Sequence, residues 1–161
     1  MEDVLALCAG VPEESFATGD ALLAEDHRGG RMLVLIEGEV GVYRQGVLVV
    51  RITEPGVFLG EISALLGMGH SASVVALAPT RCHVIDDAAT ALSSHPEVLL
   101  AVARLLARRL NAMTAYLVDL KQQYADEDGH LAMMDQVLSQ LMSVQPLPIE
   151  PGSARDDVPD Y

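Results

Sequence analysis

The sequence contains no tryptophan, and aromatic residues make up only 4% of its 161 positions. Such a chain has few side chains on which the bases of single-stranded nucleic acid could stack. Basic residues are also scarce, with 10 Lys and Arg against 23 Asp and Glu and a formal net charge of −13. Because nucleic-acid binding depends on basic side chains that neutralise phosphates, this balance argues against a nucleic-acid partner.

The chain also lacks the patterns of metal proteins, secreted proteins and common enzymes. Cys8 and Cys82 are its only cysteines, too few for an iron–sulfur cluster and typical of buried, reduced thiols. The acidic N-terminus does not resemble a signal peptide, and no run of about 18 apolar residues marks a membrane span. No Ser-His-Asp order, zinc-ligand spacing or Walker loop is present. We therefore expect a cytoplasmic protein that is not an enzyme and binds no metal.

What the sequence does contain is a series of short β-rich segments over residues 15–86. Turn pairs with glycine separate them roughly every 8–12 residues, which is typical of a compact β-barrel or roll. Residues 32–36 form a continuous apolar run, and 41–44 and 47–50 are two further predicted strands. A short helix over residues 2–10 is predicted before this region.

After this β-rich region the pattern becomes helical. A short helix is predicted from Asp87 to about Ser94, and Pro96 suits the first turn of the next helix. That helix, over residues 96–126, carries apolar residues at alternating spacings of four and three, which is a heptad seam. The seam predicts self-association as a coiled coil, although such a helix could also pack only on its own β-roll. Its residues are Leu99, Ala103, Leu106, Leu110, Met113, Leu117, Leu120 and Tyr124.

The last part of the chain is predicted to contain one more helix and a tail. Residues 127–144 place apolar side chains on one helical face, and residues 145–161 are acidic and proline-rich, a composition typical of disorder. The predicted organisation is therefore a β-roll with flanking short helices over 1–95, a dimerisation helix over 96–126, a second amphipathic helix over 127–144, and a disordered tail.

The most informative motif runs from Pro55 through Gly60 and Glu61 and ends in a run of small residues after His70. Pro55 and the glycine after it end a strand, and Gly60 and Glu61 open a short helical turn. Such a turn leaves backbone N–H groups beside a fixed carboxylate. It suits a ligand that carries both a phosphate and a sugar hydroxyl.

These residues resemble the phosphate-binding cassette of the cyclic-nucleotide-binding domain, found in catabolite activator proteins, cyclic-nucleotide-gated channels and the regulatory subunit of protein kinase A. The resemblance covers about residues 3–125 and implies an α+β fold: a jelly-roll β-roll with a short N-terminal helix and a long C-terminal dimerisation helix. It implies cAMP or cGMP as the ligand and no covalent cofactor. The acidic residues after Tyr124 do not supply the winged helix-turn-helix of this family's transcription factors, so we expect allosteric signalling to a protein partner.

The resemblance also assigns roles to individual residues. Glu61 would accept a hydrogen bond from the ribose 2′-hydroxyl; the less favoured alternative is a carboxylate that only stabilises a helix N-terminus. Met113 and Thr114 on the long helix would contact the base. The residues that would meet the cyclic phosphate or allow its close approach are Gly60, Ile62, Ser63, Ser71 and Ala72. The apolar lining of the base pocket would come from Leu35, Val47, Val49 and Val74.

His70 stands where the family usually carries an arginine against the cyclic phosphate. A histidine is only partly protonated near neutrality, whereas arginine is always charged. Two interpretations stay open. Either the bound phosphate keeps His70 charged, and the affinity falls as pH rises, or the pocket has lost its nucleotide and the protein is a degenerate dimeric scaffold that recruits a partner. A haem site with His70 and Cys82 as axial ligands is a further alternative that no other residue supports.

Overall fold

The structure is a computed structural model, and it describes residues 4–123 and 136–139. The chain divides into two compact units, Met1–Leu106 and Ala107–Tyr161. Helix α4, Pro96–Gln123, crosses the boundary between them. Within the described residues, no helix is both long and apolar enough to cross a membrane.

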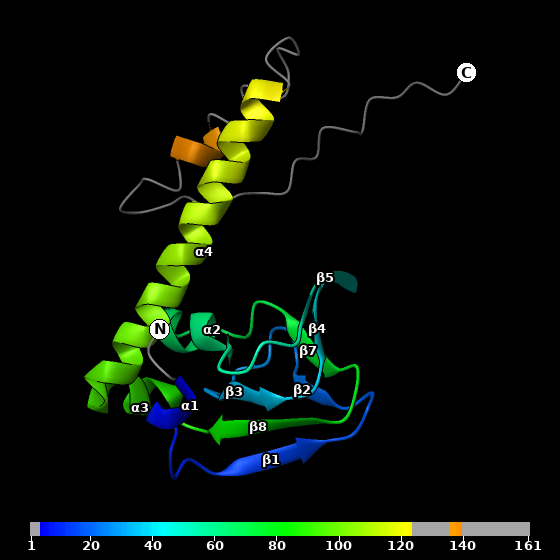
Figure 1. Ribbon diagram of the computed structural model, residues 1–161, viewed down its shortest axis with the longest axis vertical. Coiled ribbons are helices and arrows are strands. Elements are labelled where there is room, and N and C mark those ends of the chain that lie inside the picture. Colours follow the sequence, from blue (N-terminus) through cyan, green and yellow to red (C-terminus); the bar gives the residue numbers. More distant parts are fainter. Residues whose placement is uncertain (1–3, 124–135, 140–161) are drawn as a thin grey trace. The chain divides into compact units, whose positions relative to one another are not determined.

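The first unit is a β-roll with helices at both ends of its sequence (Figure 1). The elements follow one another as α1 (Val4–Leu7), β1 (Glu13–Phe16), β2 (Ala21–Leu23), β3 (Met32–Glu37), β4 (Val40–Arg44), β5 (Val47–Ile52), β6 (Phe58–Leu59), α2 (Glu61–Leu66), β7 (Ser73–Ala76), β8 (Thr80–Ile85), α3 (Ala88–Ser94) and the start of α4.

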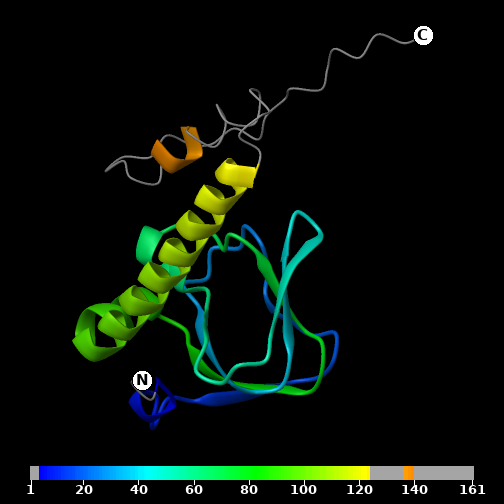
Figure 2. The same ribbon diagram turned by 45° about the horizontal axis from the view of Figure 1, so that its top comes forward.

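The described strands form two four-stranded antiparallel sheets, in the orders β1-β8-β3-β6 and β2-β7-β4-β5. Figure 2 shows the two sheets winding around a common interior. Strands far apart in sequence are thus neighbours, for example β3 with β8, where Leu33 pairs with Val84. Strand β7 follows the predicted cassette directly and pairs with both β2 and β4, which fixes the end of the cassette against the roll.

Strand β3 is apolar at consecutive positions because both of its faces are buried. Leu33 and Leu35 point into the core between the sheets, while Met32 and Val34 pack with the helices against the outer face. All four side chains are fully buried. Since each such burial contributes about 1.5–3 kcal/mol, this strand is a main source of stability.

The structure confirms the predicted fold class. Helix α3 begins after Asp87, whose side chain accepts a hydrogen bond from the backbone N–H of Thr90 at 3.1 Å, as expected for an N-cap. Helix α1 is shorter than predicted within the described residues, and the chain turns after it so that Cys8 is buried. Strand β5 extends two residues beyond the predicted 47–50.

Helix α4 begins at Pro96, as predicted, and its first turns bury Val98, Ala101 and Val102 in the outer core. Of the predicted seam residues in the first unit, Leu106 packs against this core, whereas Leu99 and Ala103 are exposed.

In the second unit, Leu110 is 45% exposed and Met113 is 57% exposed, while Leu117 and Leu120 are partly exposed. Tyr124 and the predicted tail lie outside the described residues. Of the predicted helix over 127–144, only residues 136–139 are described, and they are helical.

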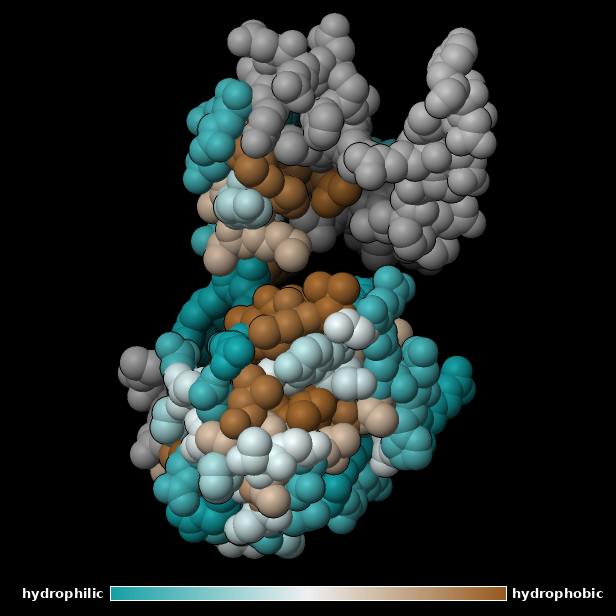
Figure 3. All heavy atoms as spheres, turned by 90° about the vertical axis from the view of Figure 1, so that its right-hand side faces the viewer, coloured by the Kyte–Doolittle hydropathy of each residue, from teal (hydrophilic) through white to brown (hydrophobic). Residues whose placement is uncertain are grey.

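Strand β5 is an edge strand with an unusual surface. Val47 is 66% exposed and Val49 is 63% exposed, and Leu48 and Val50 are exposed as well. Hydrophobic side chains gather on the face of the roll shown in Figure 3, the side on which β5 lies in Figure 1.

Candidate ligand-binding site

Gly60 sets the geometry at the start of the predicted cassette. Its φ of 86° and ψ of 5° lie in the left-handed region, and a Cβ there would come within 2.8 Å of the carbonyl oxygen of Arg31. No other residue fits this position without displacing backbone. Helix α2 then begins at Glu61, which places this carboxyl group directly after the turn.

Glu61 is buried, with only 3% of its surface exposed. The residue also makes an interaction within the protein. Ile62, by contrast, is 38% exposed. The structure therefore buries Glu61, while its proposed bond to a ribose remains a prediction.

A hydrogen bond joins the two halves of the cassette. The hydroxyl of Ser63 donates to the carbonyl oxygen of Gly60 at 2.8 Å, and its oxygen also lies 2.8 Å from Nδ1 of His70. A hydroxyl has only one proton to donate, so His70 must donate from Nδ1 to Ser63 when Gly60 receives that proton. The neutral ring then carries its proton on Nδ1, and Nε2 is left as an acceptor.

His70 is buried, and its environment disfavours the charged form. Burial lowers the pKa of His70 below its ordinary value, and the neighbouring His27 lowers it further. A contact with a phosphate would act in the opposite direction. The expected charge on His70 is therefore not supplied by the protein itself and depends on the ligand.

The backbone of His70 is held by the segment between β2 and β3. The N–H of Asp26 donates to the carbonyl oxygen of His70 at 2.8 Å, and the N–H of His70 donates to the carbonyl oxygen of His27 at 3.1 Å. One step further, the N–H of Glu25 donates to the hydroxyl of Ser73 at 2.9 Å. Hydrogen bonds, two of them between backbone groups, thus hold the end of the cassette against this segment.

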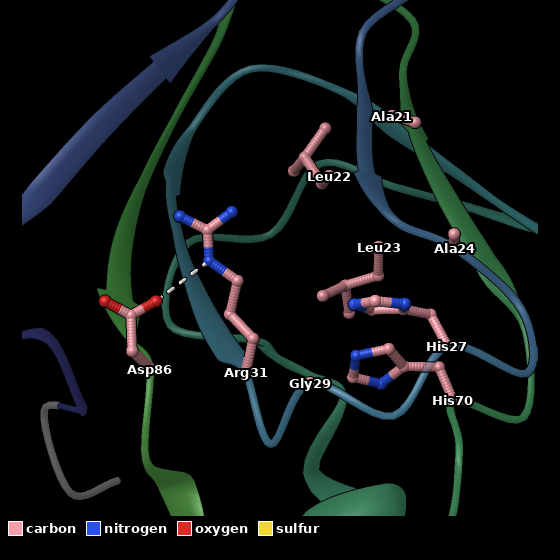
Figure 4. A pocket seen from close by; sticks show the side chains of 9 residues that line it. All are labelled: Ala21, Leu22, Leu23, Ala24, His27, Gly29, Arg31, His70 and Asp86. Carbon is pink, nitrogen blue, oxygen red and sulfur yellow. Dashed lines mark ion pairs between the residues drawn. The ribbon is translucent and has the colours of Figure 1, made fainter.

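A pocket of about 400 Å³ opens beside His70 (Figure 4). Arg31 lines it, with its Nε 3.2 Å from a carboxylate oxygen of Asp86 and a second ion pair to Glu14. Two carboxylates thus offset the charge of this arginine. The lining residues are Ala21, Leu22, Leu23, Ala24, His27, Gly29, Arg31, His70 and Asp86.

Of the predicted site residues, only His70 lines this pocket. Ser71 and Ala72 follow it and are partly buried. Met113 and Thr114 belong to the second unit, so their contact with a base remains a prediction; the hydroxyl of Thr114 donates to the carbonyl oxygen of Leu110 at 2.9 Å.

The predicted apolar lining is not brought together as expected. Leu35 and Val74 are buried in the core between the sheets, whereas Val47 and Val49 are exposed on the edge strand. The sequence showed that all four positions are apolar, but their burial depends on where each strand lies in its sheet.

His27, Arg31 and Asp86 also line the pocket, although no motif in the sequence singled them out. Residues 26–31 contain four charged or titratable side chains and two glycines, and their pattern predicted only a turn. The signal that could have revealed them is the concentration of charged and polar side chains in one connection between strands.

In the part of the chain that the structure describes, the burial of Cys82 argues against the haem alternative. Cys82 is fully buried in the core, and burial, the largest cause, raises the pKa of its thiol to about 11, which disfavours the thiolate needed for ligation. Among the residues that the structure describes, no cluster of three or more His, Cys, Asp or Glu side chains could hold a metal ion.

Comparison with known proteins identifies the family. A profile of the cyclic nucleotide-binding domain matches residues 13–91. The N-terminal domain of a transcriptional regulator from Streptomyces coelicolor A3(2) is 30% identical, with a TM-score of 0.51, over 70% of this chain and 86% of that one. The chain therefore belongs to the family of cyclic nucleotide-binding domains, regulatory modules that bind cAMP or cGMP.

Two further solved structures share the fold. The catabolite activator protein of Thermus thermophilus is 24% identical with a TM-score of 0.61, and the match covers 75% of this chain but only 60% of that protein. A protein of a cyclic-GMP-dependent signalling pathway that regulates bacterial phytopathogenesis is 22% identical with a TM-score of 0.57, over 69% of this chain and 94% of that one. A comparison with curated proteins finds no match.

Proposed function

We propose that this chain is a cytoplasmic, homodimeric sensor module that binds cAMP or cGMP in the cassette and signals through its C-terminal helices to a protein partner. The observation that carries the proposal is a buried glutamate, Glu61, directly after the left-handed glycine turn at Gly60. A buried carboxylate that faces a sugar hydroxyl forms a charge-assisted hydrogen bond, stronger than a neutral one.

In this proposal the phosphate is bound mainly by backbone amides and one hydroxyl. Ser71 supplies the hydroxyl, and the N–H groups of Ala72, Ile62 and Ser63 supply neutral donors. His70 adds a positive charge only when it is protonated. Met113 and Thr114 would contact the base, which couples ligand binding to helix α4.

Two features favour a protein partner over DNA. The net charge of −13 repels nucleic acid, and the basic residues of α4, Arg104, Arg108, Arg109 and Lys121, are few. The exposed apolar residues Leu110 and Met113 suit a helix that pairs with a second copy.

A second candidate, a degenerate scaffold without a nucleotide, is favoured by one observation. His70 is buried and bonded to Ser63, and it does not present a cation to the pocket. In this alternative the dimer and its helices recruit a partner, and the cassette is only structural.

Isothermal titration of the full chain with cAMP and with cGMP separates the two candidates. The sensor proposal expects saturable binding of at least one nucleotide, with a stoichiometry of one per chain, and no binding of 5′-AMP at the same concentrations. Absence of binding to both cyclic nucleotides at pH 6 and at pH 8 would leave the scaffold as the function.

A further inference from the structure

His27 lies next to His70 although no part of the cassette motif includes it. It belongs to the segment between β2 and β3, and Figure 4 shows its imidazole ring beside that of His70 on one side of the pocket. Each ring also lies close to a glycine. A Cβ at Gly29 would lie 3.2 Å from Cδ2 and Nε2 of His27, and a Cβ at Gly60 would lie 3.3 Å from Cε1 of His70.

We propose that His27 is a positioning residue of the ligand site: its ring lies beside that of His70, whose Nδ1 is fixed by Ser63, so that the site takes up an anionic ligand together with one proton. This inference rests on the proposed function, because the ligand considered is a cyclic nucleotide. It adds a residue from outside the cassette and a proton to the binding reaction.

The hydrogen bond to Ser63 determines which nitrogen of His70 meets the ligand. Nδ1 is turned toward α2, where Ser63 lies 2.8 Å away, and the other ring nitrogen, Nε2, points into the pocket (Figure 4). In the neutral ring, Nε2 is an acceptor, and an acceptor repels a phosphate oxygen. A favourable contact between the phosphate and His70 therefore requires a proton from solvent on Nε2, which turns this nitrogen into a charged donor.

Burial opposes this proton first, and the neighbouring His27 opposes it further, until an anion arrives. The ring of His27 lies beside that of His70, and two adjacent imidazolium rings repel each other. Arg31 lines the same pocket, but its charge is offset by Asp86 and Glu14. Glu61, buried on α2, is the carboxylate of the cassette itself. A bound phosphate adds the negative charge that makes protonation of His70 favourable.

The test has one measurement without ligand and one with cAMP, both on the full chain. In the ligand-free protein, the ring signals of His70 are followed by NMR as pH changes, in the wild type and in His27→Asn. We expect the midpoint of the His70 titration to rise in the variant, because a neighbour of like charge has been removed. His27 is exposed, so the variant should fold. His95→Asn is the matched control, since His95 is exposed and does not line the pocket.

The second measurement is the affinity for cAMP between about pH 5.5 and 8. One linked proton predicts a fall of about tenfold per pH unit above the midpoint of His70 in the free protein, until His70 of the complex loses its proton. In His27→Asn the onset of this fall should move to higher pH by the same amount as the NMR midpoint.

The outcomes are distinguishable. A shift of both the midpoint and the affinity profile supports the inference. An unchanged midpoint in His27→Asn overturns it, whether or not cAMP binds. A shifted midpoint without cAMP binding at any pH rejects the sensor function and, with it, the proton-linked ligand. Binding that does not change with pH shows that the amides carry the phosphate alone, and it also overturns the inference.

Discussion

The cassette and the outer surfaces of this chain depart from an ordinary globular protein in opposite ways. In the cassette, the polar side chains of Glu61, Ser63 and His70 are buried, whereas on β5 and α4 the apolar side chains of Val47, Leu110 and others are exposed. Buried polar groups and exposed apolar patches are the two informative exceptions to the usual distribution. We interpret the first as a site for a polar ligand and the second as surfaces that a partner would cover.

The largest effect is expected when charges are placed on the exposed apolar surfaces, and the experiment compares helix α4 with strand β5. Leu110→Asp with Leu117→Asp places two charges on each helix of the proposed seam, where their desolvation is costly. We expect the dimer to be lost at micromolar concentration, as measured by sedimentation equilibrium. The control is Val47→Asp with Val49→Asp on β5, which should remain dimeric. A wild type that is monomeric, or a control that dissociates instead, would place the self-association elsewhere.

The next effect concerns the buried carboxylate. Glu61→Gln replaces a charged acceptor by a neutral one, and we expect cyclic nucleotide binding to weaken by about 1–2 kcal/mol, or roughly 5- to 30-fold. Titration calorimetry measures the change, and Glu54→Gln, at an exposed glutamate, is the matched control. Equal affinities of Glu61→Gln and the wild type would remove Glu61 from the site.

A smaller change, of about tenfold at pH 8, is expected when the cassette regains a permanent charge. His70→Arg supplies a guanidinium that stays protonated, so binding should tighten and lose most of its pH dependence. The scaffold alternative expects either no change or new binding where the wild type shows none. Calorimetric titrations at pH 6 and pH 8 distinguish these results.

The smallest effect is on stability. The folded-state pKa of His70 lies below its value in the unfolded chain, about 6.5, so the unfolded chain binds the proton more readily. The contribution of neutral His70 is therefore fully present above about pH 6.5 and is lost as pH falls toward the folded-state value. His70→Asn keeps a donor near Ser63 but does not titrate, and its thermal midpoint should fall less than that of the wild type between pH 7 and pH 5.5. Parallel curves would show that His70 is not buried in neutral form.

These two kinds of region also show what the sequence could and could not predict. The turn at Gly60 and Glu61 has a local cause, so its place at the start of a short helix followed from the sequence. The apolar runs that became β3 and β5 predicted strands, but not that β3 would be central and buried on both faces while β5 would be an exposed edge. That difference arises from the pairing of strands distant in sequence.

For the site, too, the sequence predicted the residues of a local motif but not their neighbours in space. The motif predicted each cassette residue, whereas His27 comes beside His70 through hydrogen bonds between segments more than 40 residues apart. The orientation of the His70 ring toward Ser63 likewise depended on the fold of the whole cassette. A neighbour of this kind has no signature in a single sequence.

The backbone of His70 has a consequence for how such a sensor could change during evolution. Both its N–H and its carbonyl oxygen are bonded to the segment that contains Asp26 and His27, and these bonds do not depend on the side chain. The fold thus fixes where residue 70 stands and leaves its chemistry open to a single substitution. If the proposed proton linkage holds, one codon change at this position would exchange a proton-dependent response for a permanent one without rebuilding the roll.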